Sequence, residues 1–171
     1  MILWLLLASA CALTRGRGQS PPPYLRIPAI QGRGHLSPAL GRDVRSIGIV
    51  TALAEGEFYL QDPVGDGDPA TSDAVAVRGR IPSLIVGDEI QVIGRVVEFV
   101  PGGERTGNLP VTTIEAETVE VLGGGRSLPE PVVLGPGGSA PPSGHVISPD
   151  ELPVNLRMPA EAARNRFDPD S

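Results

Sequence analysis

The sequence is poor in the residues that build covalent and metal-dependent chemistry. It contains one cysteine, Cys11, and two histidines, His35 and His145. A single cysteine excludes an internal disulfide, and we expect no thiol chemistry in the folded part of the chain. Both histidines lie in stretches rich in glycine and proline, which offer no arrangement of metal ligands with a base to activate water. We therefore expect no catalysis from this chain.

Positive charge is also scarce in the central part of the chain. All 14 basic residues are arginines. Between residues 27 and 122, seven arginines stand against fourteen aspartates and glutamates, and 7 − 14 gives a net charge of −7. Because binding to phosphates depends on positive charge, this balance disfavours strong, free-standing binding to a nucleic acid.

The apolar run at the amino end, from Ile2 to Leu13, is too short to span a bilayer. Two arginines follow it, and we interpret residues 1–12 as an export signal, which predicts an extracellular or periplasmic protein without a membrane span in its mature form. Residues 8–10, Ala-Ser-Ala, fit the rule for signal cleavage. Cys11 offers the alternative of lipidation and a membrane anchor. A misplaced start codon within a longer signal is a third interpretation, because no basic residue precedes the run.

Residues 13–26 are expected to be a linker, because the stretch QSPPPY within them can form neither a helix nor a strand ladder. A folded domain is predicted over residues 27–123. Within it, short runs rich in β-branched residues predict five strands, near residues 43–53, 57–61, 74–77, 87–100 and 112–122. Residues 124–171 are rich in glycine and proline and are expected to be an extended segment, in which residues 159–166 could form a short helix.

The pattern of the strands favours a closed barrel. In the fourth strand, apolar and polar residues alternate around Gly94, and this glycine lets the strand bend. Gly48 lies in the middle of the first strand, where we expect a similar bend. In the fifth strand the apolar residues change parity, so a bulge is expected near Glu117 or Thr118. Five bent strands favour an all-β, five-stranded Greek-key barrel of the OB-fold kind over a sandwich, which usually needs about seven strands.

One loop, QDPVGDGDPATSD, gathers four carboxylates. Oxygen ligands on a turn that carries glycine suit calcium, and calcium is the one candidate cofactor that the sequence suggests. The spacing does not fit the twelve-residue helix–loop–helix pattern, and the favoured interpretation is an acidic turn in which Asp and Gly supply the turn conformations. The candidate ligands are Asp62, Asp66, Asp68 and Asp73.

OB barrels bind single strands through their second and third strands, by stacking on aromatic rings and by basic charge. Phe58 and Leu60 share a parity and are expected in the core, which leaves Tyr59 pointing outward. A solvated exterior, on which arginine stems lie along the barrel, is the alternative. With one outward ring, the predicted platform is weak. The candidate nucleic-acid contacts are Tyr59, Arg45, Arg78, Arg80 and Arg95.

Four ordered blocks carry a resemblance to a known family: IPAIQGRGHLSPALGRDVRSIGIVTAL, FYLQDPVGDGDPATSDAVAV, VGDEIQVIGRVVEFVPGGERTGNLPVTTI and LPEPVVLGPGG. Together they resemble the OB-like domain found ahead of the catalytic domain in bacterial secreted nucleases of the endonuclease/exonuclease/phosphatase superfamily. The resemblance covers roughly residues 27 to 145. It implies an exported accessory domain associated with the degradation of extracellular DNA or RNA.

In that family, a segment like FDP at residues 167–169 is followed by a metal-dependent catalytic domain, and here the sequence ends at Ser171. Residues 124–171 are thus expected to be a truncated continuation of the accessory region. One hypothesis is an exported module that binds single- or double-stranded nucleic acid weakly and works beside a nuclease catalytic domain. The alternatives are a structural or protein-interaction barrel without nucleic-acid contact, or a fragment of a truncated extracellular endonuclease.

Overall fold

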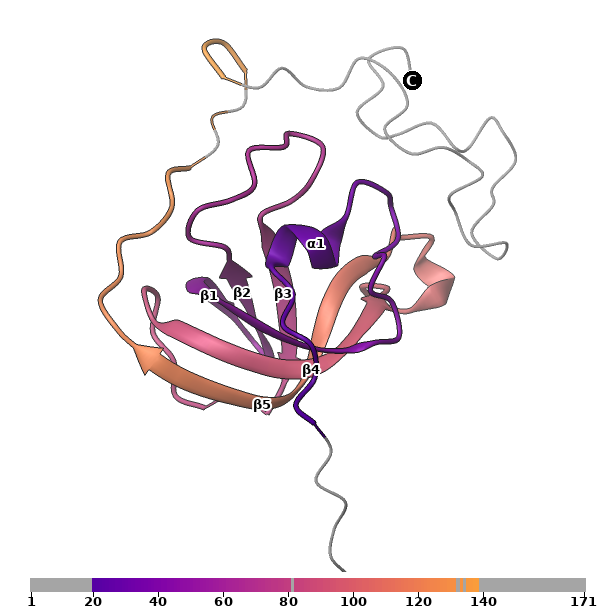
Figure 1. The fold of residues 1–171 in the computed structure, drawn as a ribbon. Helices are drawn as coiled ribbons and strands as arrows, with labels where there is room; N and C mark the ends of the chain where they lie inside the picture. The colour runs from indigo at the N-terminus through magenta and orange to yellow at the C-terminus, as the bar shows by residue number, and fades with distance from the viewer. Residues whose placement is uncertain (1–19, 81, 132, 134, 139–171) are drawn as a thin grey trace, which may run out of the picture.

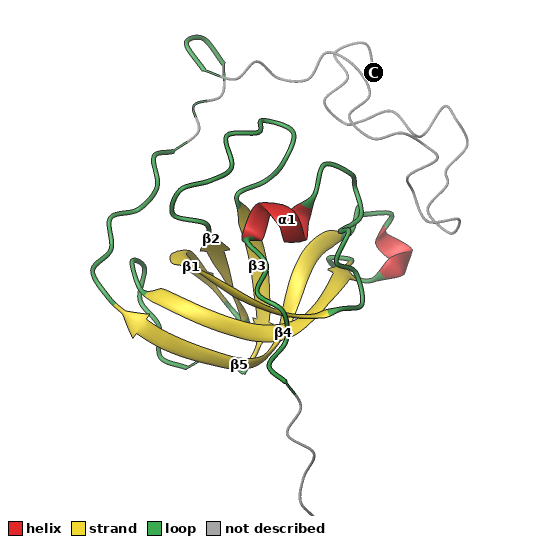
Figure 2. Cartoon of the chain, in the orientation of Figure 1, coloured by secondary structure: helices red, strands yellow, loops and turns green. Residues whose placement is uncertain are grey.

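The computed structural model describes residues 20–80, 82–131, 133 and 135–138. Within them, five strands curl around a common interior, with a short helix over one end (Figures 1 and 2). The elements are α1 (Ile27–Gln31), β1 (Asp43–Ala54), β2 (Glu57–Gln61), β3 (Ala74–Gly79), β4 (Glu89–Phe99), the 3₁₀ turn η1 (Glu104–Thr106) and β5 (Val111–Gly123). The five predicted strands agree with these bounds to within a few residues.

The strands form a closed barrel in the order β1-β2-β3-β5-β4, and β4 returns to pair with β1. All pairs are antiparallel except β3 with β5, which run parallel. Closure leaves no strand of the ring with a free edge along its whole length, which protects the barrel from pairing with other chains. The prediction of an all-β, five-stranded, OB-fold-like Greek-key barrel is confirmed.

The interior is filled by the alternate residues of each strand. Phe58 and Leu60 on β2 are completely buried, whereas Tyr59 between them is 38% exposed, as predicted. β-branched residues supply most of the remaining core, because they pack well on a pleated surface. The other fully buried large side chains are Ile27, Ile30, Ile90, Ile114, Val44, Val50, Val75, Val77, Val92 and Val96.

Two glycines and one bulge allow the sheet to close. A Cβ atom on Gly48 would lie 2.6 Å from the carbonyl oxygen of Gln61, and one on Gly94 would collide with the backbone of Glu115. Both positions therefore require glycine, because neighbouring backbones approach too closely for a side chain. The register between β4 and β5 shifts where Ile93 faces Thr118 and Gly94 faces Ala116, so Glu117 is the extra residue. The predicted bulge is confirmed.

The segment before β1 closes one end of the barrel. Ile27 and Ile30 of α1 are completely buried, and the helix lies over the ends of β1 and β3 (Figure 1). Just before it, the amide of Leu25 donates to the carbonyl of Arg45, and the amide of Arg45 donates to the carbonyl of Pro23. The end of the range interpreted as a linker is therefore paired to β1, and the sequence did not predict α1.

Several predictions concern residues outside the described ranges. These are the export signal over residues 1–12, lipidation at Cys11, the position of His145 and the short helix over residues 159–166. Within the described ranges, no helix has the length and apolar character needed to cross a membrane.

Candidate nucleic-acid interface

Tyr59 is the aromatic residue that the sequence predicted to stack on a base. It lies on β2, between Ala52 of β1 and Ala76 of β3, so small side chains flank it on both neighbouring strands. Its hydroxyl donates to Oε1 of Glu57 at 2.9 Å. This hydrogen bond raises the pKa of the Tyr59 hydroxyl above its ordinary value, and partial burial acts in the same direction. The ring is thus held at the barrel surface with its hydroxyl already engaged.

Two of the predicted arginines belong to a row of charges that alternate in sign around the barrel. Glu57 on β2 is the cross-strand partner of Arg78 on β3, and Arg78 is the partner of Glu115 on β5. Arg95 on β4 lies between Glu115 on β5 and Asp43 on β1. The Nε atoms of Arg78 and Arg95 lie 3.5 Å and 3.6 Å from carboxylate oxygens of Glu57 and Asp43. We call these five residues the charge row.

The charge row limits what Arg78 and Arg95 can offer to a phosphate. The guanidinium of Arg78 also lies 3.8 Å from the centre of the Phe99 ring, and Nε of Arg95 donates to the carbonyl of Gly41 at 3.0 Å. Each exposed pair contributes little to stability, about 0–1 kcal/mol. The carboxylates of Glu57 and Asp43 nevertheless offset the positive charges of Arg78 and Arg95, which the sequence assigned to nucleic-acid binding.

Arg45 has different surroundings from Arg78 and Arg95. Its Nη1 donates to Oε1 of Gln91 at 3.2 Å, and its guanidinium carbon lies 5.6 Å from the centre of the Tyr24 ring. Among the described residues, no carboxylate forms an ion pair with Arg45 or with the exposed Arg80, which follows β3. Arg80 is exposed, whereas Arg45 is half-buried and its Nε is fully buried.

The structure therefore distributes the five predicted residues around the barrel. Tyr59 and Arg78 lie on β2 and β3, Arg80 follows β3, and Arg45 and Arg95 lie on β1 and β4. The sequence missed Tyr24 and Arg26, which the run of prolines before them made look like part of a linker. The available signal was a tyrosine and an arginine two positions apart, the spacing of residues on one side of an extended chain.

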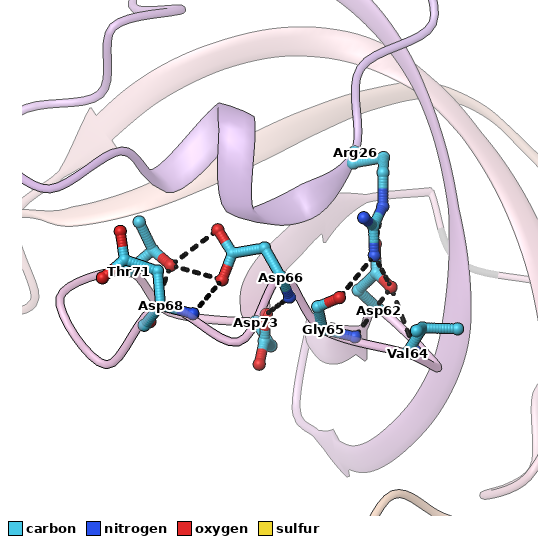
Figure 3. Close-up of polar contacts among 8 residues, drawn as sticks. All are labelled: Arg26, Asp62, Val64, Gly65, Asp66, Asp68, Thr71 and Asp73. Carbon is cyan, nitrogen blue, oxygen red and sulfur yellow. Dashed lines mark hydrogen bonds and ion pairs between the residues drawn. The ribbon is translucent and has the colours of Figure 1, made fainter.

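The acidic loop, residues 62–73, connects β2 to β3 and is tied to the segment before α1 (Figure 3). Nε and Nη2 of Arg26 donate to the two carboxylate oxygens of Asp62, at 3.0 Å and 2.7 Å. Nη2 of Arg26 also donates to the carbonyl of Gly65 at 2.8 Å, and the amides of Val64 and Gly65 donate to Asp62, both at 3.1 Å. The carboxylate of Asp62 is 4% exposed.

The pKa of Asp62 reflects two opposing effects. Burial disfavours the charged form of the carboxylate, and this is the largest single effect. The hydrogen bonds from Arg26, Val64 and Gly65, together with the charge of Arg26, outweigh it and lower the pKa below its ordinary value. Asp62 is therefore ionised and engaged near neutral pH.

The other three carboxylates of the loop also serve as acceptors within it. Asp66 accepts from the amide of Asp68 and the hydroxyl of Thr71, both at 2.9 Å, and Asp73 accepts from the amide of Asp66 at 3.2 Å (Figure 3). The hydrogen bond from the amide of Ala70 lowers the pKa of Asp68, and Arg33 acts in the same direction. Nowhere in the described ranges do three or more His, Cys, Asp or Glu side chains form a group that could hold a metal ion. The structure shows the contacts of an acidic turn.

Two open grooves lie at the barrel surface. One, of about 480 Å³, is formed at the β1–β2 turn and the segment after β3, and is lined by Leu53, Ala54, Gly56, Glu57, Gly79, Pro82, Ser83 and Leu84. The second, of about 290 Å³, is lined by Tyr24, Arg26, Ile47, Asp62, Pro63 and Val64.

Comparisons with known proteins found similarity among solved structures only. No family model and no curated protein matches the chain. The Stn1–Ten1 complex from S. pombe is similar with a TM-score of 0.36 and 11% identity, over 61% of this chain and 79% of that one. A small single-stranded DNA-binding protein from Streptomyces coelicolor is similar with a TM-score of 0.32 and 19% identity, over 47% of this chain and 92% of that one. The telomere capping protein Ten1 from Saccharomyces pombe is similar with a TM-score of 0.29 and 15% identity, over 48% of this chain and 67% of that one.

These comparisons correct the expected family. The resemblance to accessory domains of secreted nucleases is contradicted, since no family model or curated protein matches and the similar structures named above are not secreted nucleases. The first three quoted blocks cover α1, most of the strands and several of the turns of the barrel, whereas the fourth, residues 128–138, follows β5. Alternating β-branched residues and Gly/Asp turns are what such a barrel requires, so they do not identify one family.

Proposed function

We propose that this chain is a weak binding module for single-stranded nucleic acid. The observation that carries the proposal is Tyr59, which stands outward on β2 of an OB-fold-like barrel with 38% of its surface exposed. Arg78 and the exposed Arg80 lie on and after the neighbouring strand β3. An exposed ring beside basic side chains can bind single strands, because every nucleotide has a base that can stack on the ring and a phosphate that attracts a cation.

The charges of the barrel set the expected strength of binding. Residues 27–122 carry a net charge of −7, and the charge row already engages Arg78 and Arg95 with carboxylates. Few phosphates can therefore be neutralised. We expect a dissociation constant in the range of non-specific binding, about 10⁻⁴ to 10⁻⁶ M, with a shallow dependence on salt.

Titration of a fluorescent single-stranded oligonucleotide with the full chain at about 20 mM salt tests this proposal. Tyr59→Ala is expected to weaken binding by about 1 kcal/mol or more, which is about fivefold, because it removes one stacked base. Tyr59→Phe keeps the ring and loses only the hydrogen bond to Glu57, so it should bind like the unmodified protein. Arg95→Ala should have a smaller effect than Tyr59→Ala, because Asp43 already offsets its charge.

The control for a general loss of charge is Arg126→Ala, because Arg126 lies after β5 and pairs with Glu89 at 2.5 Å. It should leave the affinity unchanged. Absence of binding at this low salt would overturn the proposal, and binding that neither Tyr59→Ala nor Arg95→Ala weakens would overturn the role of these two residues in it.

A protein-interaction barrel is the second candidate function. The groove of about 480 Å³ beside the β1–β2 turn favours it, because Leu53 in its lining is 47% exposed and Ile85 just beyond it is 64% exposed. Exposed apolar side chains beside a groove are typical of protein contacts. An unmodified protein that binds no oligonucleotide would leave this candidate in place.

A further inference from the structure

A second aromatic site is built around Tyr24, which the sequence did not predict. It is the groove of about 290 Å³ lined by Tyr24, Arg26, Ile47, Asp62, Pro63 and Val64, which we call the Tyr24 groove. The groove forms where the segment before α1 pairs with β1 at Arg45 and where the chain leaves β2 at Asp62. Three segments far apart in the sequence thus build one surface.

The Tyr24 groove combines an exposed ring with apolar side chains. Tyr24 is 45% exposed and Val64 is 85% exposed, while Ile47 on the outer side of β1 is half-buried. Figure 3 shows Val64 beside the carboxylate of Asp62, at the start of the acidic loop. A volume of about 290 Å³ is at the lower end of what small-molecule sites have, about 300–1,000 Å³, so one planar group of modest size fits.

Arg45 does not line the groove itself but supplies positive charge beside Tyr24. Its guanidinium lies 5.6 Å from the centre of the Tyr24 ring, and among the described residues it donates one hydrogen bond, to Gln91. Its Nε atom is buried and has no acceptor within the described part of the chain. A guanidinium carries five N–H groups, so Arg45 retains N–H groups that could donate hydrogen bonds to an anion.

The neighbouring acid does not repel an anion, because Arg26 offsets its charge. Both oxygens of Asp62 accept from Arg26, at 3.0 Å and 2.7 Å, and the carboxylate is almost completely buried. The two charges at the groove lining therefore cancel, and Arg45 is left as the uncompensated cation. The same contacts hold the acidic loop against the segment that carries Tyr24, so the groove exists before a ligand binds.

We propose that the Tyr24 groove binds one unpaired nucleobase of a single strand, stacked on Tyr24, with Arg45 neutralising an adjacent phosphate. The proposal rests on the proposed function, to which it adds a second stacking position. Tyrosine rings and arginines are the groups that single-strand binding proteins place along a strand. A neutral apolar peptide would fill the groove and leave Arg45 without an anion.

The test is the oligonucleotide titration at about 20 mM salt, with substitutions in the groove. Tyr24→Ala is expected to weaken binding at least about fivefold, and Tyr24→Phe should bind within about twofold of the unmodified protein, because the ring remains. Arg45→Gln, which can still pair with Gln91, should weaken binding and lower the salt slope by about one phosphate contact. Arg126→Ala again serves as the control.

A second measurement works on the unmodified protein, which covers the case in which Tyr24→Ala perturbs folding. Titration of the ¹⁵N-labelled full chain with the same oligonucleotide should shift the amide resonances of Val64 and Gly65. The Tyr24 groove would be overturned, and the proposed function left intact, by one combined result. In that result these amides do not shift and Tyr24→Ala and Arg45→Gln do not weaken binding, while Tyr59→Ala still does. No binding by the unmodified protein would overturn both. Weaker binding on Tyr24→Ala but not on Tyr59→Ala would support the groove and overturn the role of Tyr59.

Discussion

Replacing Asp62 with alanine is expected to lower the free energy of unfolding by about 2 kcal/mol. Removing one partner of a fully buried ion pair costs about 3–5 kcal/mol, whereas an exposed pair contributes about 0–1 kcal/mol. The Asp62–Arg26 pair lies between these limits, because the side chain of Asp62 is 4% exposed and that of Arg26 is 44% exposed. Arg26 can turn to water, but the amides of Val64 and Gly65 lose their acceptor.

For a domain of about 100 residues, this loss corresponds to a fall in Tm of about 8–16 °C. Thermal and urea unfolding of the full chain measure it, and a double-mutant cycle with Arg26→Ala isolates the coupling between the two side chains. The matched control is Asp68→Ala in the same loop, whose partner Arg33 is 74% exposed, so the loss of stability should be much smaller than for Asp62→Ala. Equal losses for Asp62→Ala and Asp68→Ala would refute the reasoning.

The same pair predicts how stability depends on pH. The pKa of Asp62 is lower in the folded protein than the value of about 3.9 expected in the unfolded chain. Its contribution is therefore present above that value and is lost as pH falls through the folded pKa. Asp62→Asn should lack this contribution at neutral pH, so the difference in Tm between it and the unmodified protein should narrow below about pH 4. A difference that stays constant down to pH 2 would contradict the assignment.

Three further predictions concern the barrel, calcium and catalysis. Gly94→Ala should cost about 1–3 kcal/mol, because its Cβ would collide with the backbone of Glu115, whereas Gly123→Ala, which meets open space, should stay within about 0.5 kcal/mol on thermal unfolding. If the loop is an acidic turn, millimolar calcium should not raise the Tm, and a rise that vanishes in Asp66→Ala would support the calcium hypothesis. Plasmid and single-stranded DNA should stay uncut with magnesium, manganese or calcium, and metal-dependent cleavage lost in His35→Ala would disprove that expectation.

Local patterns in the sequence determined the strands and their faces. The alternation around Tyr59 correctly placed Phe58 and Leu60 in the core, because residues two apart in a strand share a side. The change of parity in β5 correctly located a bulge, which the structure assigns to Glu117. Each of these features depends on a few consecutive residues, and for that reason it can be read from the chain alone.

Tertiary structure decided which side chains meet. Arg26 and Asp62 are 36 positions apart, and Arg45 reaches Tyr24 because the segment before α1 pairs with β1. The charge row crosses all five strands, so its order depends on the register of four strand pairs, including the parallel pair of β3 with β5. Such contacts arise from barrel closure between distant segments, and no local periodicity of the sequence encodes them.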